Sequence, residues 1–176
     1  MTSNVQKHLV LVGLMGAGKT TVGRRCAQQL SRDFVDTDDV VARLAGVPVA
    51  EVFATKGEAQ FRALEREAVA DVCASPAPLV IGCGGGTIVD PDNRRRLARA
   101  GFVVWLRAPV DVLARRVGEG ADRPLLEGNP PAALTRLLTL REPAYAAAAD
   151  VSVETEDRSV DDVADAVLAA FCAVTQ

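Results

Sequence analysis

Short, wholly apolar runs alternate along the chain with longer segments that repeat apolar residues every three or four positions. Leu9 to Val12, Leu79 to Gly82 and Phe102 to Leu106 are runs of the first kind. Because no polar residue interrupts them, they predict strands buried on both faces of a parallel sheet. The segment that starts at Glu58 is of the second kind and predicts a helix with one buried face. The alternation predicts an α/β fold with helices on both sides of the sheet.

Prolines, glycines and capping residues set the expected boundaries of these elements. Asp90 with Pro91 is a typical helix start, and Gly101 is a typical stop. The segment 117–131 is rich in Gly, Pro and Asp and lacks a regular pattern, which predicts a mobile lid. The expected strands are 9–12, 34–35, 79–82, 102–106 and 151–153, and the expected helices are 21–30, 40–46, 47–54, 91–100, 132–149, 159–174 and two that start at 58 and 109.

A glycine-rich stretch, GLMGAGKT from Gly13 to Thr20, stands between the first strand and the first helix. It fits the pattern G-x-x-x-x-G-K-[ST], whose backbone N–H groups cradle phosphates at a helix N-terminus. Lys19 is expected to reach the β- and γ-phosphates of a nucleotide. Thr20 is expected to offer its hydroxyl to Mg²⁺. The stretch therefore predicts a nucleotide site at the end of the first strand.

Two further polar or flexible clusters follow the next two strands. Asp36, Asp38 and Asp39 come after the second strand, and the triplet 84–86 of three glycines comes after the third. Carboxyl ends of parallel strands meet at one edge of a sheet, so these clusters are expected to share one crevice with the phosphate loop. The third strand carries no acidic magnesium ligand, and the aspartates after the second strand are the available substitutes. The crevice suits phosphoryl transfer to a small acceptor.

Composition narrows the possible classes of protein. The 176 residues, 49% of them apolar, are enough for one well-filled core, and one domain is expected. A net charge of −3 gives no general attraction to nucleic acid or to an anionic membrane. The apolar runs are too short for a signal peptide or a membrane span, which predicts a cytoplasmic protein.

The scattered cysteines and the lone histidine do not suggest a metal site. Cys26, Cys73, Cys83 and Cys172 lack the C-x-x-C spacing of zinc sites and favour buried thiols. His8 precedes the first strand and is expected to lie on the surface. Cys83, next to the glycine triplet, is either a small residue at a crowded strand end or a thiol near the site.

Six motifs in fixed order carry a resemblance that spans nearly the whole chain. GLMGAGKT, DTD, FRALE, GGG, RPLL and LREPAY together resemble a bacterial shikimate kinase. The resemblance implies phosphorylation of the 3-hydroxyl of shikimate by ATP with Mg²⁺, in chorismate and aromatic amino-acid biosynthesis. It also implies a P-loop NTPase fold of the nucleoside-monophosphate-kinase-like, three-layer type, with five parallel strands in the order 2-3-1-4-5. A single domain over 1–176, with acceptor-binding helices at about 38–74, and a monomer are expected.

The same resemblance implies roles for individual residues. Lys19 would hold the transferring phosphate, Asp38 would accept or orient the acceptor hydroxyl, and Arg123 would close over the phosphates from the lid. Thr20 would bind Mg²⁺, assisted by Asp36. The implied ATP-binding residues are Gly16, Ala17, Gly18, Lys19, Thr20, Thr21, Arg116, Arg123 and Arg158.

Acceptor recognition is implied by a separate set of residues. Arg62 and Arg141 would grip the shikimate carboxylate, because a planar guanidinium binds a carboxylate in two-pronged fashion, and Glu65 would orient Arg62. Asp39 is interpreted as ending the strand and capping the next helix. The implied shikimate-binding residues are Asp38, Arg62, Gly84, Gly85, Gly86 and Arg141.

Two other functions remain open at this point. A related kinase of small metabolites, such as a gluconate kinase, would share the phosphate loop and the lid. A non-catalytic shikimate-sensing module would share the fold, although such modules usually carry a DNA-binding segment or a broken loop. The chain also departs from the family in VETEDRSV, where a proline expected in the adenine loop is missing. The contacts to the nucleotide base are therefore open.

Overall fold

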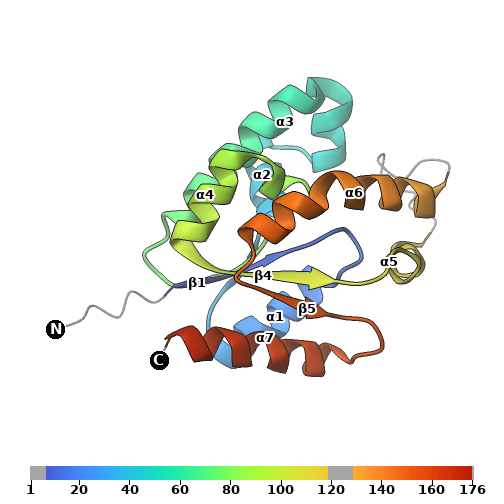
Figure 1. Cartoon of the computed structure of the whole chain (residues 1–176). Coiled ribbons are helices and arrows are strands. Elements are labelled where there is room, and N and C mark those ends of the chain that lie inside the picture. Colours follow the sequence, from blue (N-terminus) through green and yellow to red (C-terminus); the bar gives the residue numbers. More distant parts are fainter. Residues whose placement is uncertain (1–6, 119–128, 176) are drawn as a thin grey trace.

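A five-stranded parallel sheet forms the centre of the computed structural model, which describes residues 7–118 and 129–175 (Figure 1). The strand order is β2-β3-β1-β4-β5, as predicted. The strands are β1 (His8–Val12), β2 (Phe34–Asp36), β3 (Val80–Gly82), β4 (Gly101–Arg107) and β5 (Val151–Glu154). Residues of β1, β3 and β4 are buried on both sides, as their uninterrupted apolar sequences predict.

Helices cover both faces of this sheet and give the predicted three layers. In Figure 1, α1 and α7 lie side by side below the sheet, and α4 and α6 lie above it. The helices α2 and α3 pack on each other beside α4. The helices are α1 (Lys19–Leu30), α2 (Thr37–Ala45), α3 (Val49–Cys73), α4 (Pro91–Ala100), α5 (Val110–Val117), α6 (Pro130–Ala148) and α7 (Val160–Thr175), with a 3₁₀ turn, η1, at Thr87–Val89.

Most predicted boundaries agree with the structure to within a few residues, and several capping predictions are confirmed. The side chain of Asp90 accepts hydrogen bonds from the N–H groups of Asp92 and Asn93 at the start of α4. Gly57 interrupts α3 with a non-helical φ of 80° and ψ of 172°, where the sequence predicted a break. Trp105 belongs to the core and stacks on Tyr145 with ring centroids 5.5 Å apart.

The prediction that His8 lies on the surface is wrong. His8 is the first residue of β1, is 5% exposed, and pairs with Gly101 of β4. Its Nδ1 accepts a hydrogen bond of 2.9 Å from the N–H of Leu79. Burial lowers the pKa of His8, which favours the neutral ring that this bond requires. The sequence pattern missed this because a polar residue can end a buried strand when one backbone group satisfies it.

The helix expected to begin at Val40 begins three residues earlier. Asp36 caps α2, because its side chain accepts the N–H of Asp38 at 3.0 Å, and Thr37 is the first helical residue. The capping role that the sequence suggested for Asp39 therefore belongs to Asp36. Asp38 and Asp39 lie in the first turn, where negative charge is stabilised by the helix dipole. Asp38 thus projects from a rigid helix turn instead of a loop.

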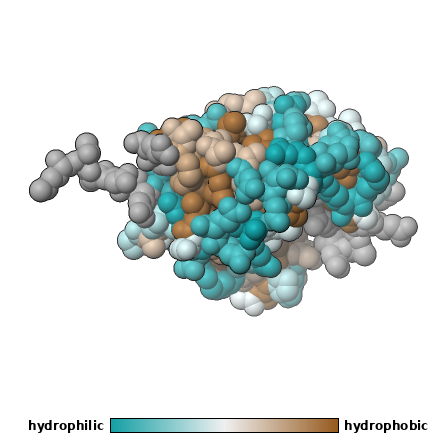
Figure 2. Space-filling view, turned by 90° about the horizontal axis from the view of Figure 1, so that it is seen from below, coloured by the Kyte–Doolittle hydropathy of each residue, from teal (hydrophilic) through white to brown (hydrophobic). Residues whose placement is uncertain are grey.

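The face formed by α1 and α7 is seen from below in Figure 2. It is mostly hydrophilic, with a smaller apolar area among the polar side chains. Arg25 and Gln29 of α1 contact Asp161 and Asp165 of α7 on this side of the molecule. Within the described ranges, no helix combines the length and the apolar character needed to cross a membrane.

Candidate active site

The phosphate loop has the backbone that its glycines predict. Gly13, Gly16 and Gly18 have φ values of 146°, 82° and 93°, which residues with side chains rarely adopt. Helix α1 begins at Lys19 with no side chain capping its first turn. Its N-terminal N–H groups therefore face the crevice, where an anion is stabilised by the helix dipole. The Nζ of Lys19 donates to the carbonyl oxygens of Gly13 and Leu14, each at 2.9 Å.

Two side chains with oxygen atoms that can bind a metal ion, Thr20 and Asp36, lie together at the exposed edge of this loop. The hydroxyl of Thr20 donates to Oδ2 of Asp36 at 3.2 Å, while Oδ1 of Asp36 caps α2. A hydroxyl and a carboxylate are the ligand types that Mg²⁺ accepts, and it usually completes its shell with phosphate oxygens and water. Among the described residues, no group of three or more His, Cys, Asp or Glu side chains could hold a metal by itself.

Asp38 faces the glycine triplet from the first turn of α2. A methyl group placed on Gly84 would lie 2.5 Å from its Oδ1. Burial raises the pKa of Asp38 to about 6, and the negative charges of Asp36 and Glu65 act in the same direction. Lys19 acts in the opposite direction and stabilises the charged carboxylate. Such a carboxyl group can take up a proton near neutral pH, which suits a general base.

The other two glycines of the triplet face the two arginines of the FRALE and LREPAY motifs. A methyl group on Gly85 would lie 3.1 Å from Nη1 of Arg141, and one on Gly86 would lie 2.9 Å from Nη1 of Arg62. Each glycine therefore leaves room for one side chain from a neighbouring helix. Arg141 is 8% exposed and lies in α6, whereas Arg62 is partly buried in α3.

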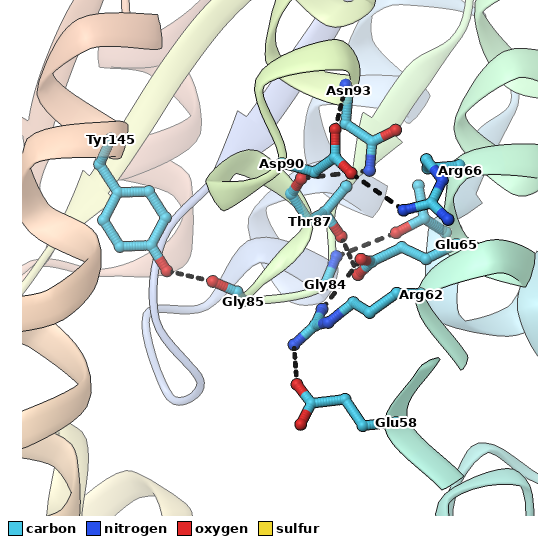
Figure 3. A network of polar contacts seen from close by, with 11 residues as sticks. Glu58, Arg62, Glu65, Arg66, Gly84, Gly85, Thr87, Asp90, Asn93 and Tyr145 are labelled. Atoms are coloured by element: carbon cyan, nitrogen blue, oxygen red, sulfur yellow. Dashed lines mark hydrogen bonds and ion pairs between the residues drawn. The ribbon is translucent and has the colours of Figure 1, made fainter. Parts of the chain in front are cut away.

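A chain of carboxylate contacts fixes Arg62 (Figure 3). Its Nη1 donates to Oε2 of Glu65 at 2.9 Å and its Nη2 to Glu58 at 3.3 Å. Glu65 is only 1% exposed, and its other oxygen accepts the hydroxyl of Thr87 at 2.7 Å. The side-chain Nδ2 of Asn93 donates a hydrogen bond of 3.3 Å to the carbonyl oxygen of Thr87. The orienting contact expected from Glu65 is present and is itself held by buried groups.

Arg116 and Arg158 line the same cavity from the opposite side, and both are engaged by backbone groups. Arg116 donates to the carbonyl oxygen and hydroxyl of Thr155 at 2.7 and 2.8 Å, and to the carbonyl oxygen of Gly16 at 3.4 Å. Arg158 donates to the carbonyl oxygens of Glu154 and Asp162. Arg116 thus connects the phosphate loop to the segment after β5. Arg123 and most of the predicted lid lie outside the described residues.

These groups surround one cavity of about 920 Å³ at the carboxyl ends of β1, β2 and β3. Cys83 lies at its base, is 1% exposed, and has a pKa raised well above the usual range by burial. A protonated, buried thiol is a poor nucleophile, which favours the interpretation of Cys83 as a small residue at a crowded strand end. The sequence-predicted residues that line this cavity are Gly16, Ala17, Gly18, Lys19, Thr20, Thr21, Asp36, Asp38, Arg62, Gly84, Gly85, Gly86, Arg116, Arg141 and Arg158.

Sequence reasoning missed three contributions to this cavity. Phe53 and Phe61 form an apolar wall with ring centroids 4.3 Å apart. The hydroxyl of Thr37 accepts the N–H of Gly84 at 2.9 Å. The hydroxyl of Tyr145 donates to the carbonyl oxygen of Gly85 at 2.6 Å. Thr37 and Tyr145 stand within motifs that were recognised, but only the fold brings them to the triplet.

A phosphate loop, a carboxylate and a pair of arginines around one cavity, on a sheet of order 2-3-1-4-5, define a small-molecule kinase of the P-loop class. Comparison with models of protein families matches residues 15–172 to shikimate kinase. The chain is 48% identical over 159 residues to the shikimate kinase of Symbiobacterium thermophilum, which covers 89% of this chain and 91% of the relative. The chain therefore belongs to the shikimate kinase family.

Solved structures agree with this assignment. Shikimate kinase from Acinetobacter baumannii in complex with shikimate superposes with a TM-score of 0.92 and 35% identity, covering 97% of this chain and 96% of that one. A gluconokinase from Sinorhizobium meliloti 1021 superposes with a TM-score of 0.68 at 19% identity, covering 97% of this chain and 94% of that chain, a likeness that shows the fold alone. The family assignment thus favours shikimate over gluconate as the expected acceptor.

Proposed function

We propose that the chain transfers the γ-phosphoryl group of ATP to the 3-hydroxyl of shikimate, giving shikimate 3-phosphate and ADP in chorismate and aromatic amino-acid biosynthesis. One observation carries this proposal: Asp38, Arg62 and Arg141 meet at the glycine triplet, in the cavity that also contains the phosphate loop. This arrangement matches an acceptor that has both a carboxylate and a reactive hydroxyl. Membership of the shikimate kinase family supports it.

Within this proposal, each group has a defined task. Arg62 and Arg141 bind the acceptor carboxylate, which places a ring hydroxyl next to Asp38. The acceptor oxygen forms the new bond to phosphorus as the bond to the leaving oxygen of ADP breaks, and Asp38 accepts the hydroxyl proton. Lys19 leaves the loop carbonyls to bind the transferring phosphate. Arg123, which is not among the described residues, is proposed to complete the stabilisation of the negative charge on the phosphates.

Magnesium is proposed as the metal that accompanies ATP. Thr20 and Asp36 would hold it, and their 3.2 Å contact brings together oxygen ligands of the type that Mg²⁺ requires. When bound, the ion would neutralise phosphate charge. Gly16, Ala17, Gly18, Thr21, Arg116 and Arg158 are proposed to contact the nucleotide. A single domain over residues 1–176, a monomer, a cytoplasmic location and the absence of nucleic-acid or membrane partners remain predictions.

The proposal is tested by coupled ADP release from the purified chain with MgATP and shikimate, quinate, gluconate or no acceptor. We expect turnover with shikimate to exceed that with gluconate or no acceptor, because a cyclic hydroxy acid matches both the arginine pair and Asp38. It should also exceed turnover with quinate, whose ring carries an additional hydroxyl beside the carboxylate that the arginine pair binds. Quinate is the matched control, since it keeps the carboxylate but differs in the ring. Gluconate-dependent turnover would favour the related kinase, and shikimate binding without ADP release would favour the sensing module.

A further inference from the structure

Tyr145 holds one peptide of the glycine triplet from α6 (Figure 3). Its side chain is fully buried, stacks on Trp105, and donates its hydroxyl to the carbonyl oxygen of Gly85 at 2.6 Å. Burial raises the pKa of Tyr145 to about 12, so the hydroxyl keeps its proton and acts as a donor. The shortness of this bond and the packing of the ring fix the direction in which the Gly85 carbonyl points.

The direction of that carbonyl also sets the direction of the next N–H group. In a trans peptide the C=O of one residue and the N–H of the next point to opposite sides of the chain, and all described peptide bonds are trans. Because Tyr145 draws the Gly85 oxygen toward α6, the N–H of Gly86 points away from α6. Arg62 lies close to Gly86, since a methyl group there would meet its guanidinium at 2.9 Å.

The N–H groups of Gly85 and Gly86 have no acceptor within residues 7–118 and 129–175, although both residues line the cavity. Their neighbours differ, because the N–H of Gly84 donates to Thr37 and that of Thr87 donates to the Gly84 carbonyl at 3.1 Å. Glycine peptides rotate easily, and without an anchor either orientation would be populated. The triplet is thus held at Gly84 by Thr37 and at Gly85 by Tyr145.

We propose that Tyr145 is a positioning residue for the acceptor: by holding the Gly85 carbonyl, it presents the Gly86 N–H to an acceptor oxygen beside Arg62. This inference rests on the proposed function. Arg141 and Tyr145 are four residues apart and lie on one face of α6. One helix therefore supplies both a charge next to Gly85 and the anchor that orients its peptide.

Tyr145→Phe tests this role, because it removes the hydroxyl, with its hydrogen bonds to Gly85 and Arg141, and keeps the ring on Trp105. We expect the KM for shikimate, and its Kd measured by calorimetry, to rise about fivefold to tenfold, because the hydroxyl that orients the Gly85 peptide and contacts Arg141 is lost. The KM for ATP should stay within about twofold, because the Tyr145 hydroxyl is bonded to the triplet and to Arg141. The kcat should fall less than the KM rises. An unchanged KM and Kd for shikimate would overturn the proposal.

Trp105→Phe is the matched control, since it disturbs the same aromatic stack and leaves the Tyr145 hydroxyl in place. We expect it to lower the melting temperature without raising the KM for shikimate. If both variants raise that KM equally at equal loss of melting temperature, the effect is one of packing and the positioning role is wrong. The proposed function is tested independently of the Tyr145 role: it is wrong if the unaltered chain shows no shikimate-dependent ADP release.

Discussion

At the scale of single residues, Asp38 combines its proposed role as proton acceptor with a cost in stability. Its carboxyl group is kept near the glycine triplet by α2, and its pKa is raised to about 6 by burial and by the charges of Asp36 and Glu65. The usual value is 3.8. At pH values between 3.8 and about 6, the Asp38 carboxyl group is more often protonated in the folded chain than in the unfolded chain. The contribution of Asp38 to the free energy of unfolding is therefore largest below pH 3.8 and falls as the pH rises to about 6.

Asp38→Asn should separate these two effects. We expect turnover with shikimate to fall at least about a hundredfold, because the proton acceptor is lost, while the affinity for ATP stays nearly unchanged. The same variant should melt at a higher temperature than the unaltered chain at pH 7, since a neutral amide is not penalised by burial next to Asp36 and Glu65. Steady-state kinetics, ATP titration and thermal melts measure the three quantities.

The pH dependence supplies the control for this prediction. The gain in melting temperature should shrink as the pH is lowered from 7 to 4, because Asp38 then becomes neutral in the unaltered chain as well. Shikimate binding without ATP should also weaken in the unaltered chain as the pH falls through about 6, and should vary less in the Asn variant. A loss of ATP affinity as large as the loss of turnover would contradict the assigned role.

At the scale of elements, the turn between β3 and η1 consists of glycines because three side chains from neighbouring helices pack closely against it. Its three glycines lie against Asp38, Arg141 and Arg62, which come from three different helices. Any side chain in the triplet would displace one of these groups. The sequence placed three glycines after β3, but it could not predict that they face side chains from three different helices, because that depends on how α2, α3 and α6 pack.

Gly84→Ala should therefore affect the acceptor site selectively. The added methyl group would lie 2.5 Å from Oδ1 of Asp38 and 3.1 Å from the Thr87 hydroxyl, so the carboxylate must move. We expect kcat/KM for shikimate to fall about a hundredfold, the cost of a displacement of this size at the reacting centre. ATP affinity should change little, because the atoms nearest to the new methyl group belong to Asp38 and Thr87 and not to the phosphate loop. Kinetics with each substrate varied in turn would measure this.

Gly46→Ala is the control for Gly84→Ala, because it should lower the stability of the fold without changing the acceptor site. Gly46 ends α2 with a φ of 72°, and nothing lies within 4 Å of the position of an added methyl group. The substitution strains the backbone and should lower the melting temperature by several degrees while kcat/KM for shikimate is kept. Equal kinetic losses in both variants would show that Gly84→Ala acts through stability and not through Asp38.

At the scale of the whole molecule, the proposed acceptor site lies between two helices that are distant in sequence. Arg62 comes from α3 and Arg141 from α6, and the triplet lies between their guanidinium groups. Glu65 holds Arg62 from one side and is itself held by the hydroxyl of Thr87. The proposed clamp of two arginines exists only when both helices are packed against the carboxyl end of the sheet. Small movements of α3 or α6 would therefore change acceptor binding before they change nucleotide binding.

Arg62→Ala and Arg141→Ala test the clamp. Each should weaken shikimate binding about tenfold to a hundredfold, because each removes a charged hydrogen-bonding partner of the carboxylate. ATP affinity should remain close to that of the unaltered chain, as measured by calorimetry with each substrate. Arg66→Ala is the control: Arg66 lies in the next turn of α3, is exposed, and pairs with Asp90. Unchanged shikimate affinity in both clamp variants would refute the carboxylate role.

Much of the architecture could be predicted because its signals are local. Uninterrupted apolar runs identified the buried strands, and glycines and prolines marked the breaks. Errors occurred where one distant contact outweighed the local pattern. His8 is buried because Leu79, 71 residues away, donates a hydrogen bond to its ring. Helix α2 begins early because Asp36 turns its side chain back to cap it.

The sequence by itself determined which chemical groups stand at the ends of the strands: a phosphate loop after β1, acids after β2 and glycines after β3. It did so because periodicity and turn chemistry act over a few residues. Only the tertiary structure decided the state of those groups. Burial raises the pKa of Asp38, and Tyr145 orients a glycine peptide 60 residues away. Desolvation and long-range hydrogen bonds arise only when the helices pack on the sheet.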